Sequence, residues 1–234
     1  MKLISRDDVY KICLKFNVYC REWPQDTFST THVYSPRSKK FLIYEVNIPK
    51  LDIIEKMCSE RGLKTRDQCV RFVEKNIAHE VKHVEKQNEL LSNCHEVLYF
   101  YKTIPKTMAF VENACEDVTI EKEIMATYGD IYVKQCEIYI TKDIDTVKRD
   151  VEIFINFKKD FQQLLQAIVG FVACNVEDKL LKAIDKARID SKVKEIVKSM
   201  VDTLTRLRRG EISLCECVLG MLQSTLKFRC ETKS

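Results

Sequence analysis

The spacing of apolar residues along the chain predicts helices over most of its length. Apolar positions recur at helical intervals over residues 3–20, 51–61, 66 to beyond 91 and 105 to about 126, and again from 143 almost to the end with interruptions near Gly170, Asp190 and Gly210. Residues 39–48 instead concentrate β-branched and aromatic side chains ahead of a proline, which predicts a strand. Residues 131–140 look strand-like for the same reason, and the stretch 23–38, rich in Ser and Thr with two prolines, predicts a break. The expected fold class is therefore α+β, predominantly helical.

These patterns divide the chain into three parts, although no repeat or Pro/Gly/Ser-rich linker marks a boundary. We expect an N-terminal helix and loop in residues 1–38, a unit that combines the strand with several helices in 39–140, and a C-terminal helical region in 141–234. The longest uncharged stretch, 161–176, is shorter than the roughly 20 apolar residues that span a bilayer, and it contains Gln and Asn. It predicts a buried core helix and no membrane association.

Net charge and cysteine content bear on partners and compartment. Lys and Arg exceed Asp and Glu by 39 − 35 = 4, a surplus too small to indicate a nucleic-acid partner. Arg6, Asp7 and Asp8 interrupt the apolar segment that a signal peptide needs, so we expect an intracellular protein. The 11 cysteines are then expected mainly as reduced core residues, with a hyperthermophile host as the exception in which disulfides form.

One short motif carries recognisable chemistry. Residues 79–83 read His79-Glu80-Val81-Lys82-His83, which resembles the His-Glu-x-x-His pattern of zinc metallopeptidases. On a helix, histidines four positions apart lie on one side, where both imidazoles can reach a single tetrahedral zinc ion. The motif therefore predicts a zinc site in which His79 and His83 are ligands.

Helical periodicity places the two histidines away from the expected core. A stripe of apolar residues that fall within about 80° of arc predicts the buried side of this helix, and the histidines lie off it. The residues of this stripe are Val70, Val73, Ile77, Val81 and Val84. The pattern disfavours a pair of core histidines, and it leaves open a solvated helix face that carries Asn76, His79 and His83 without a metal.

A catalytic zinc site needs a third protein ligand, and zinc peptidases differ in where it lies. In the metzincin arrangement a glycine and then the ligand follow the second histidine, but here those positions are Lys86 and Glu89. A gluzincin instead takes a glutamate from a separate downstream helix. Residues 111–124, about 30 positions further along, supply glutamates on such a helix. The sequence therefore favours the gluzincin arrangement.

The same stretch resembles a family signature. Residues 113–121 read Asn-Ala-Cys-Glu-Asp-Val-Thr-Ile-Glu and match, at six of nine positions, the Asn-Ala-Leu-Glu-Asp-Ala-Arg-Ile-Glu signature of metallopeptidase-like domains associated with von Willebrand factor A modules. The order of strand, backing helix, active-site helix and glutamate helix over 39–127 also resembles the compact minigluzincin scaffold. The resemblance implies a gluzincin-type zinc metallopeptidase unit with Glu116 as third ligand. Glu112, one turn earlier, and Asp117 are the alternative or supporting ligands.

This ligand set implies a mechanism for hydrolysing peptide bonds. His79, His83 and Glu116 would leave one coordination position for water. Zinc would lower the pKa of that water toward neutrality, and Glu80 would take its proton as the general base. The partner implied is a peptide or protein substrate.

The resemblance also suggests how such a substrate is held. The strand at 39–48 would align an extended peptide by pairing along its edge. Tyr128 and Tyr132, just past the glutamate helix, are positional candidates for stabilising the oxyanion, although tyrosines at such positions more often have a structural role.

Two functions of other classes stay open. The chain could be a non-enzymatic helical interaction protein whose motif is a degenerate or structural metal site. It could also bind nucleic acid through Arg206, Arg208 and Arg209, which the small net charge disfavours. In either case the C-terminal helices could bind a partner or form an oligomer.

Two weaker motifs are expected to be structural. His95-Glu96 has no second histidine at ligand spacing, so His95 is expected to be exposed or to cap a helix. Cys215 and Cys217 have no second Cys or His pair nearby in the sequence and are expected as core residues.

Overall fold

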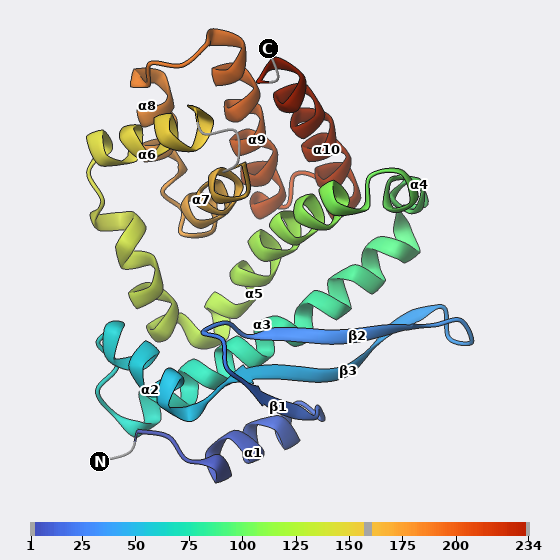
Figure 1. Ribbon diagram of the computed structural model, residues 1–234, viewed down its shortest axis with the longest axis vertical. Coiled ribbons are helices and arrows are strands. Elements are labelled where there is room, and N and C mark those ends of the chain that lie inside the picture. Colours follow the sequence, from blue (N-terminus) through green and yellow to red (C-terminus); the bar gives the residue numbers. More distant parts are fainter. Residues whose placement is uncertain (1–2, 157–160, 233–234) are drawn as a thin grey trace. The chain divides into compact units, whose positions relative to one another are not determined.

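In a computed structural model of the protein, which describes residues 3–156 and 161–232, helices predominate over a small three-stranded sheet (Figure 1). The predicted class, a predominantly helical α+β fold, is confirmed. In chain order the elements are α1 (Arg6–Lys15), β1 (Cys20–Trp23), β2 (Ser29–Ser35), β3 (Lys40–Pro49), α2 (Leu51–Glu60), α3 (Arg66–Asn93), α4 (Glu96–Thr103), α5 (Pro105–Thr141), α6 (Ile144–Asn156), α7 (Phe161–Ala173), α8 (Glu177–Lys186), α9 (Ser191–Arg209) and α10 (Leu214–Glu231).

The described residues form two compact units. Unit 1 comprises 3–89 and 123–135, and unit 2 comprises 90–122 and 136–232. This division does not follow the three segments expected from the sequence, because the N-terminal helix shares a core with β3. Ile4 and Ile12 belong to the same buried cluster as Val46 and Ile54. The long helices α3 and α5 each contribute residues to both units.

The sheet of unit 1 has β3 in the centre, between β1 and β2 (Figure 1). β1 is parallel to the end of β3, with Cys20 opposite Val46, and β2 is antiparallel along most of its length. The sequence analysis was wrong about residues 23–38, since β2 lies where a break was expected. The prolines flank this strand rather than interrupt it, and its β-branched residues suit a pleated sheet.

The active-site helix of the sequence analysis is present as α3. Gly62 ends the preceding turn with a φ of 66°, which favours glycine. Thr65 caps α3 as predicted: its Oγ1 accepts a hydrogen bond from Gln68 N at 3.2 Å, and Gln68 Oε1 accepts one from Thr65 N. The apolar stripe is confirmed, because Val73 and Ile77 are buried in the core of unit 1 and the remaining stripe residues pack at its margin or are buried themselves.

The strand expected at residues 131–140 is wrong, because these residues continue α5. The chain leaves helical geometry only at Tyr128, with φ −121° and ψ 33°, at the break that the sequence predicts. Ile131, Tyr132 and Cys136 are buried, a spacing that fits a helix. Packing has therefore overridden the β propensity of this stretch, which depends strongly on context.

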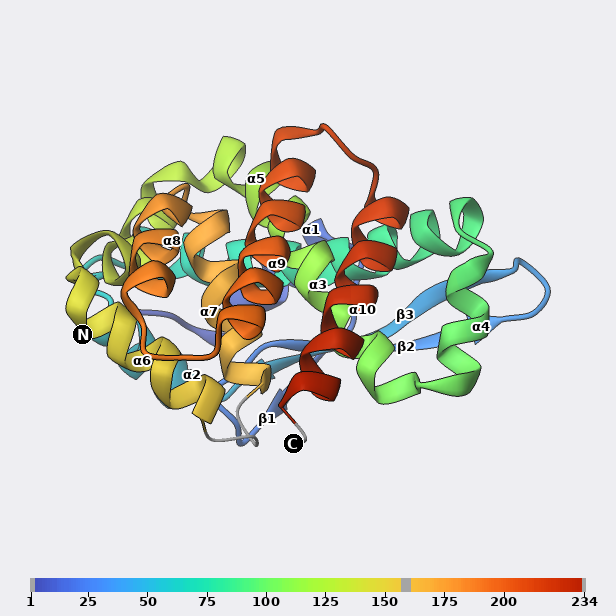
Figure 2. The same cartoon turned by 90° about the horizontal axis from the view of Figure 1, so that it is seen from above.

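Unit 2 consists of helices around one large apolar core. α9 and α10 lie side by side in both views (Figures 1 and 2), and α7 is the buried core helix expected near 161–176. Asp190 caps α9 by accepting hydrogen bonds from two backbone amides, and Gly210 ends it with a φ of 78°. Gly170 is not a break, since it lies inside α7 where a Cβ would meet the ring of Tyr139. Residues 157–160 and 233–234 of the expected C-terminal region are outside the described residues.

The cysteines are not mainly reduced, which corrects the sequence expectation. Four disulfides join residues whose Cα atoms lie 5.5–6.2 Å apart, two in each unit. The pairs are Cys13–Cys20, Cys58–Cys69, Cys94–Cys215 and Cys136–Cys174. Composition and compartment gave no information on which cysteines the fold brings together. No helix in the described part of the chain has the length and apolar character needed to span a membrane.

Candidate metal centre

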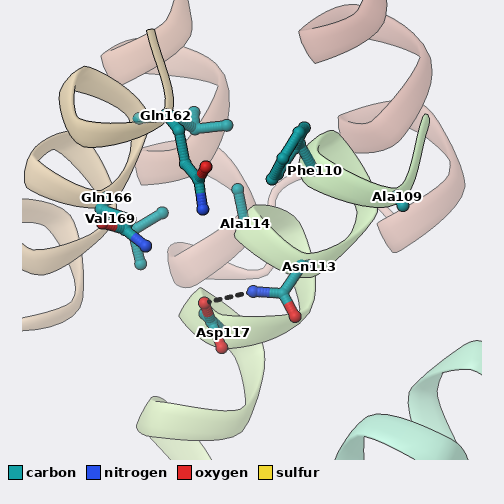
Figure 3. A pocket seen from close by; sticks show the side chains of 9 residues that line it. Ala109, Phe110, Asn113, Ala114, Asp117, Gln162, Gln166 and Val169 are labelled. Atoms are coloured by element: carbon teal, nitrogen blue, oxygen red, sulfur yellow. Dashed lines mark hydrogen bonds between the residues drawn. The ribbon is translucent and has the colours of Figure 1, made fainter. Parts of the chain in front are cut away.

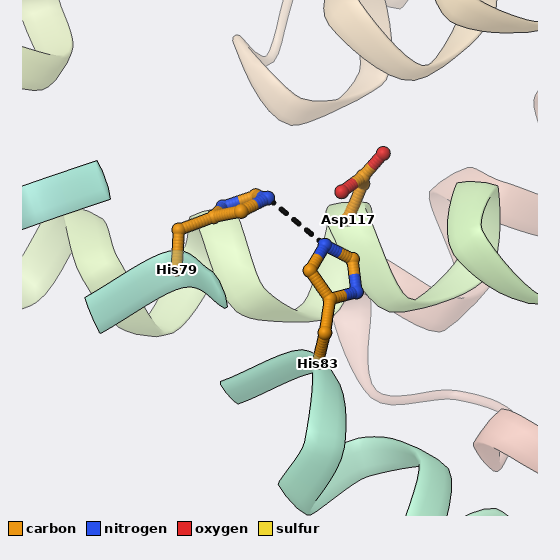
Figure 4. Close-up of side chains that lie close together, drawn as sticks. All are labelled: His79, His83 and Asp117. Carbon is orange, nitrogen blue, oxygen red and sulfur yellow. Dashed lines mark hydrogen bonds between the residues drawn. The ribbon is translucent and has the colours of Figure 1, made fainter. Parts of the chain in front are cut away.

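His79 and His83 project from the same side of α3 (Figure 4), and helical periodicity puts that side opposite the apolar stripe. Both side chains are partly buried, and their Nε2 atoms lie 3.0 Å apart with the rings inclined at 76°. Helical spacing accounts for this arrangement, because positions i and i+4 lie one above the other. The motif thus brings two metal-ligand atoms together within one helix of unit 1.

The separation of the two nitrogens bears on what they can do. Two nitrogens bound at about 2.0–2.1 Å to one tetrahedral zinc ion lie ~3.3 Å apart. The observed 3.0 Å is close to that separation, and it also suits a direct hydrogen bond between two neutral imidazoles. Rotation of either ring by a few degrees would convert one arrangement into the other.

The motif also contains Glu80 and Lys82. Glu80 is partly buried and follows the first histidine on α3. Lys82, an unusual charge between the motif's glutamate and second histidine, pairs with Glu123 of α5 at 2.6 Å, and Lys86 pairs with the same carboxylate at 2.8 Å. Burial raises the pKa of Glu123, but the hydrogen bonds from the two lysines outweigh it and lower the pKa below its usual value. The charge of Lys82 is therefore neutralised within unit 1.

One edge of β3 runs beside the motif helix. Asn88 of α3 accepts a hydrogen bond from Phe41 N at 2.7 Å and donates one to Phe41 O at 3.0 Å, as a neighbouring strand would. β1 pairs only from Val46 onward, so in the described chain no strand covers this side of β3 at Ile43. Because alternate residues of a strand point their backbone groups to the same side, the N–H and C=O of Ile43 face this edge.

His32 is a residue that the sequence analysis missed. It lies on β2 opposite Ile43, and its ring packs edge-on against Phe41 with centroids 5.0 Å apart. Burial lowers the pKa of His32, and the charge of His83 lowers it further. The sheet thus brings a third histidine near the motif. No sequence signal could have found it, because β2 itself was not predicted.

The candidate carboxylates belong to the first half of α5, in unit 2. Glu112 and Glu116 are buried, one turn apart, and Asp117 is partly buried and accepts a hydrogen bond from Asn113 at 3.0 Å. By helical periodicity Glu112, Glu116 and Glu123 fall within about 40° of arc on α5, so they form one stripe, and Asp117 is rotated by about 100° from Glu116.

A pocket in unit 2 opens beside this turn of α5. It has a volume of about 330 Å³ and lies between α5 and α7 (Figure 3). Its floor is apolar, and an aspartate and three side-chain amides lie around it. The lining residues are Ala109, Phe110, Asn113, Ala114, Asp117, Gln162, Leu165, Gln166 and Val169. One carboxylate beside an aromatic ring suits an apolar side chain that ends in a cation or a hydrogen-bond donor.

The tyrosines considered for the oxyanion have structural surroundings. Tyr128 donates a hydrogen bond to Glu74 at 2.9 Å, and burial together with that carboxylate raises its pKa. Tyr132 is buried. Both lie in unit 1 at the kink of α5, and the structure gives neither a catalytic geometry. Tyr128 in particular is engaged in holding α3 to α5.

His95 and the arginines at the end of α9 are the next residues that the sequence analysis singled out. His95 is exposed at the start of α4, as expected. The arginines at the end of α9 each meet a polar partner, and their distances to those partners range from 2.7 to 3.8 Å. These pairs are Arg206 with Glu211, Arg208 with Asn175 and Arg209 with Glu177.

Cys217 is buried in the core of unit 2 and Cys215 packs against it, as expected, and each sulfur also lies close to that of another cysteine. Cys215 is bonded to Cys94, and Cys217 Sγ lies 3.2 Å from Cys115 Sγ. Burial raises the pKa of Cys115, and its contact with Cys217 raises it further. Cys94, Cys215 and Glu96 also cluster, but the disulfide leaves no thiolate there to bind a metal.

Comparisons with protein-family models, with curated proteins and with solved structures found no match to this chain.

Proposed function

We propose that the protein is a zinc-dependent peptidase in which His79 and His83 hold the metal and Glu80 is the general base. The observation that carries the proposal is the 3.0 Å separation of the two Nε2 atoms on one side of α3. Imidazole nitrogens are preferred zinc ligands, and the separation fits two of them around one tetrahedral ion. The donor set therefore suits zinc better than Mg²⁺ or Ca²⁺, which favour oxygen.

The third ligand in this proposal is a carboxylate of α5, and Glu116 is favoured by the resemblance to gluzincins. Glu116 is buried on α5, one turn after the buried Glu112. Asp117 and Glu112 are the alternatives. A buried carboxylate is retained where a cation or hydrogen bonds offset its desolvation, and a metal ion is one such cation.

The proposal assigns one chemical role to the zinc ion and one to Glu80. Zinc, when bound, supplies a Lewis acid that lowers the pKa of water toward neutrality. Glu80 follows His79 on α3 and would accept the proton as water attacks the peptide carbonyl. Lys82, the charged residue between Glu80 and His83, pairs with Glu123.

The proposed substrate is an extended peptide. Its backbone would pair at Ile43 with the edge of β3 that no strand of the described chain covers, beside the residue that Asn88 already engages in the same way. The order β3, α2, α3 and α5 is the order of elements in the minigluzincin scaffold to which the sequence analysis likened it.

Zinc stoichiometry tests the proposal. The wild-type chain should bind one zinc ion, and His79→Ala and His83→Ala should each lower affinity by about 100-fold or more, since each removes one of three ligands. Glu116→Gln, Glu112→Gln and Asp117→Asn, compared in parallel, identify the third ligand as the one whose loss weakens binding most. His95→Ala is the matched control, because it removes an exposed histidine outside the motif.

Hydrolysis is tested separately. Glu80→Gln should keep zinc bound and abolish cleavage of a peptide library, because the amide cannot take the proton. Zinc content that stays the same in His79→Ala and His83→Ala would overturn the metal site. Zinc binding with no cleavage by the wild type would reduce the proposal to a structural metal site.

The second candidate is an interaction protein with such a structural site. One observation favours it: Val33, Leu42 and Tyr44 are all at least half exposed, and Val33 lies opposite Leu42 in the β2–β3 ribbon. Exposed apolar residues on a sheet face often mark a binding surface. In that case Val33→Ser would weaken partner binding without changing zinc content.

A further inference from the structure

We infer that Cys115 and Cys217 are a modification site, at which a small-molecule disulfide oxidises the two thiols to a fifth disulfide between α5 and α10. Their Sγ atoms lie 3.2 Å apart, and both side chains are completely buried. A disulfide requires the sulfurs to approach to about 2.05 Å, a movement of about 1 Å that side-chain rotation can supply. The third free cysteine, Cys230, is exposed near the end of α10.

The approach of the two sulfurs is held in place by features around Cys217. Ser213 and Glu216 form a capping box that fixes where α10 begins. The disulfide between Cys94 and Cys215 anchors the same turn of α10 from another side. The capping box and the disulfide therefore both hold in place the turn of α10 that carries Cys217.

The reaction balances with a small-molecule disulfide as the oxidant. One cysteine, as thiolate, attacks oxidised glutathione, which forms a mixed disulfide and releases one glutathione thiol. The second cysteine then displaces the remaining glutathione. Two protein thiols and one oxidised glutathione become one protein disulfide and two reduced glutathione molecules, so atoms and electrons balance. Because both sulfurs are buried, the exchange proceeds during folding or by local opening of α10.

The new bond would act on one turn of α5. Glu116 follows Cys115 directly, and Glu112 lies one turn earlier, so the bond would tie the turn that carries both carboxylates to α10. With Cys94–Cys215 already formed, it closes only a short additional ring, and the midpoint of thermal unfolding should rise by ~5 °C. The inference concerns thiols only and does not depend on the proposed peptidase function.

Peptide mapping tests it directly. The reduced chain is refolded in a buffer of reduced and oxidised glutathione, its remaining thiols are alkylated, and it is digested with trypsin. The expected product joins three tryptic peptides, 87–102, 107–122 and 210–227, through two disulfides, and leaves Cys230 as the alkylated residue. Further cleavage after Glu216, between Cys215 and Cys217, assigns each bond to its own cysteine.

Two variants test whether the new disulfide forms specifically between Cys115 and Cys217. Cys230→Ser should keep the three-peptide product, because that cysteine takes no part in it. Cys115→Ala should give only 87–102 joined to 210–227, with Cys217 alkylated. Recovery of 107–122 from the wild type with an alkylated Cys115, or joined to a cysteine other than Cys217, would overturn the inference whether or not the variants fold.

Discussion

The two halves of α5 show how one helix takes part in two kinds of packing. In 105–122, within unit 2, buried apolar side chains such as Met108, Val111 and Val118 join the large core. In 123–135, within unit 1, polar side chains pair individually with α3, as Glu123 does with Lys82 and Asp130 with Arg71 at 2.7 Å. The first half is stabilised mainly by apolar burial, and the second half combines buried residues such as Ile124 and Ile131 with these directional contacts.

This difference concerns how a carboxylate is accommodated on the helix. In the second half, the carboxylates of Glu123 and Asp130 pair with basic side chains of α3. In the first half, Glu112 and Glu116 are buried beside residues of the large apolar core. Removing a carboxylate from water costs free energy, so these two positions are more constrained by their surroundings than a partly exposed ion pair is.

The largest effect is expected from adding one methyl group to unit 2. Gly170→Ala places a Cβ about 2.2 Å from Tyr139 Cζ, which requires the ring to move. The overlap should cost ~3 kcal/mol and outweigh the ~1 kcal/mol gained in helix propensity. Urea unfolding measures the net loss.

Gly220→Ala on α10 is the matched control, since its Cβ would make only an ordinary contact with Thr203. There the propensity gain should dominate and raise stability by ~0.5–1 kcal/mol. Equal effects of the two substitutions would show that the contact with Tyr139 does not restrict residue 170.

In unit 1, the largest expected effect comes from a side chain that acts as a strand. Asn88→Ala removes both hydrogen bonds to Phe41 and should cost ~2 kcal/mol, because it leaves the backbone N–H and C=O of Phe41 without that partner. Asn76→Ala is the comparison, because that side chain bonds only to Phe72 O of its own helix and should cost less than ~1 kcal/mol. Hydrogen exchange of the backbone amides of β3 measures the loss of stability in each of the two variants.

An acid titration should affect unit 1 through Asp8. Hydrogen bonds from Arg66 lower the pKa of Asp8 from 3.8 to about 2. The carboxylate therefore contributes its full stabilisation above pH 3.8, and this is lost as pH falls toward 2. Because Arg66 is largely exposed, we expect ~1 kcal/mol. Asp8→Asn should flatten the stability profile between pH 4 and 2, and an unchanged profile would contradict the assignment.

The smallest effect should come from the shared carboxylate between α3 and α5. Glu123→Gln removes ion pairs with Lys82 and Lys86 and should cost ~0.5–1 kcal/mol at low salt. The loss should shrink in 1 M NaCl, because salt screens partly exposed charges. A cost that does not change with salt would show that the contact acts through packing instead.

Local signals predicted most of the helical frame. The cap at Thr65, the proline at the start of α5 and the break at Tyr128 were each readable, because each acts within one turn of chain. β2 and the end of α5 were not, since the flanking prolines masked the first and the β propensity of residues 131–140 misled about the second, and partners distant in sequence decide the outcome.

The candidate site was only partly predictable for the same reason. His79, Glu80 and His83 lie within one helical turn, so helical geometry alone places them together. His32 depends on the pairing of β2 with β3, and the disulfides depend on which helices pack together. The spacing of residues within one segment does not reveal which strands pair or which helices pack together.

The passage of α5 through both units has a practical outcome for anyone dissecting the chain. The polypeptide changes unit after residues 89, 122 and 135, each time without leaving a helix. No single cut yields either unit as a contiguous fragment, so truncated genes would each lack part of a core. Dissection of this protein must therefore proceed by point substitution.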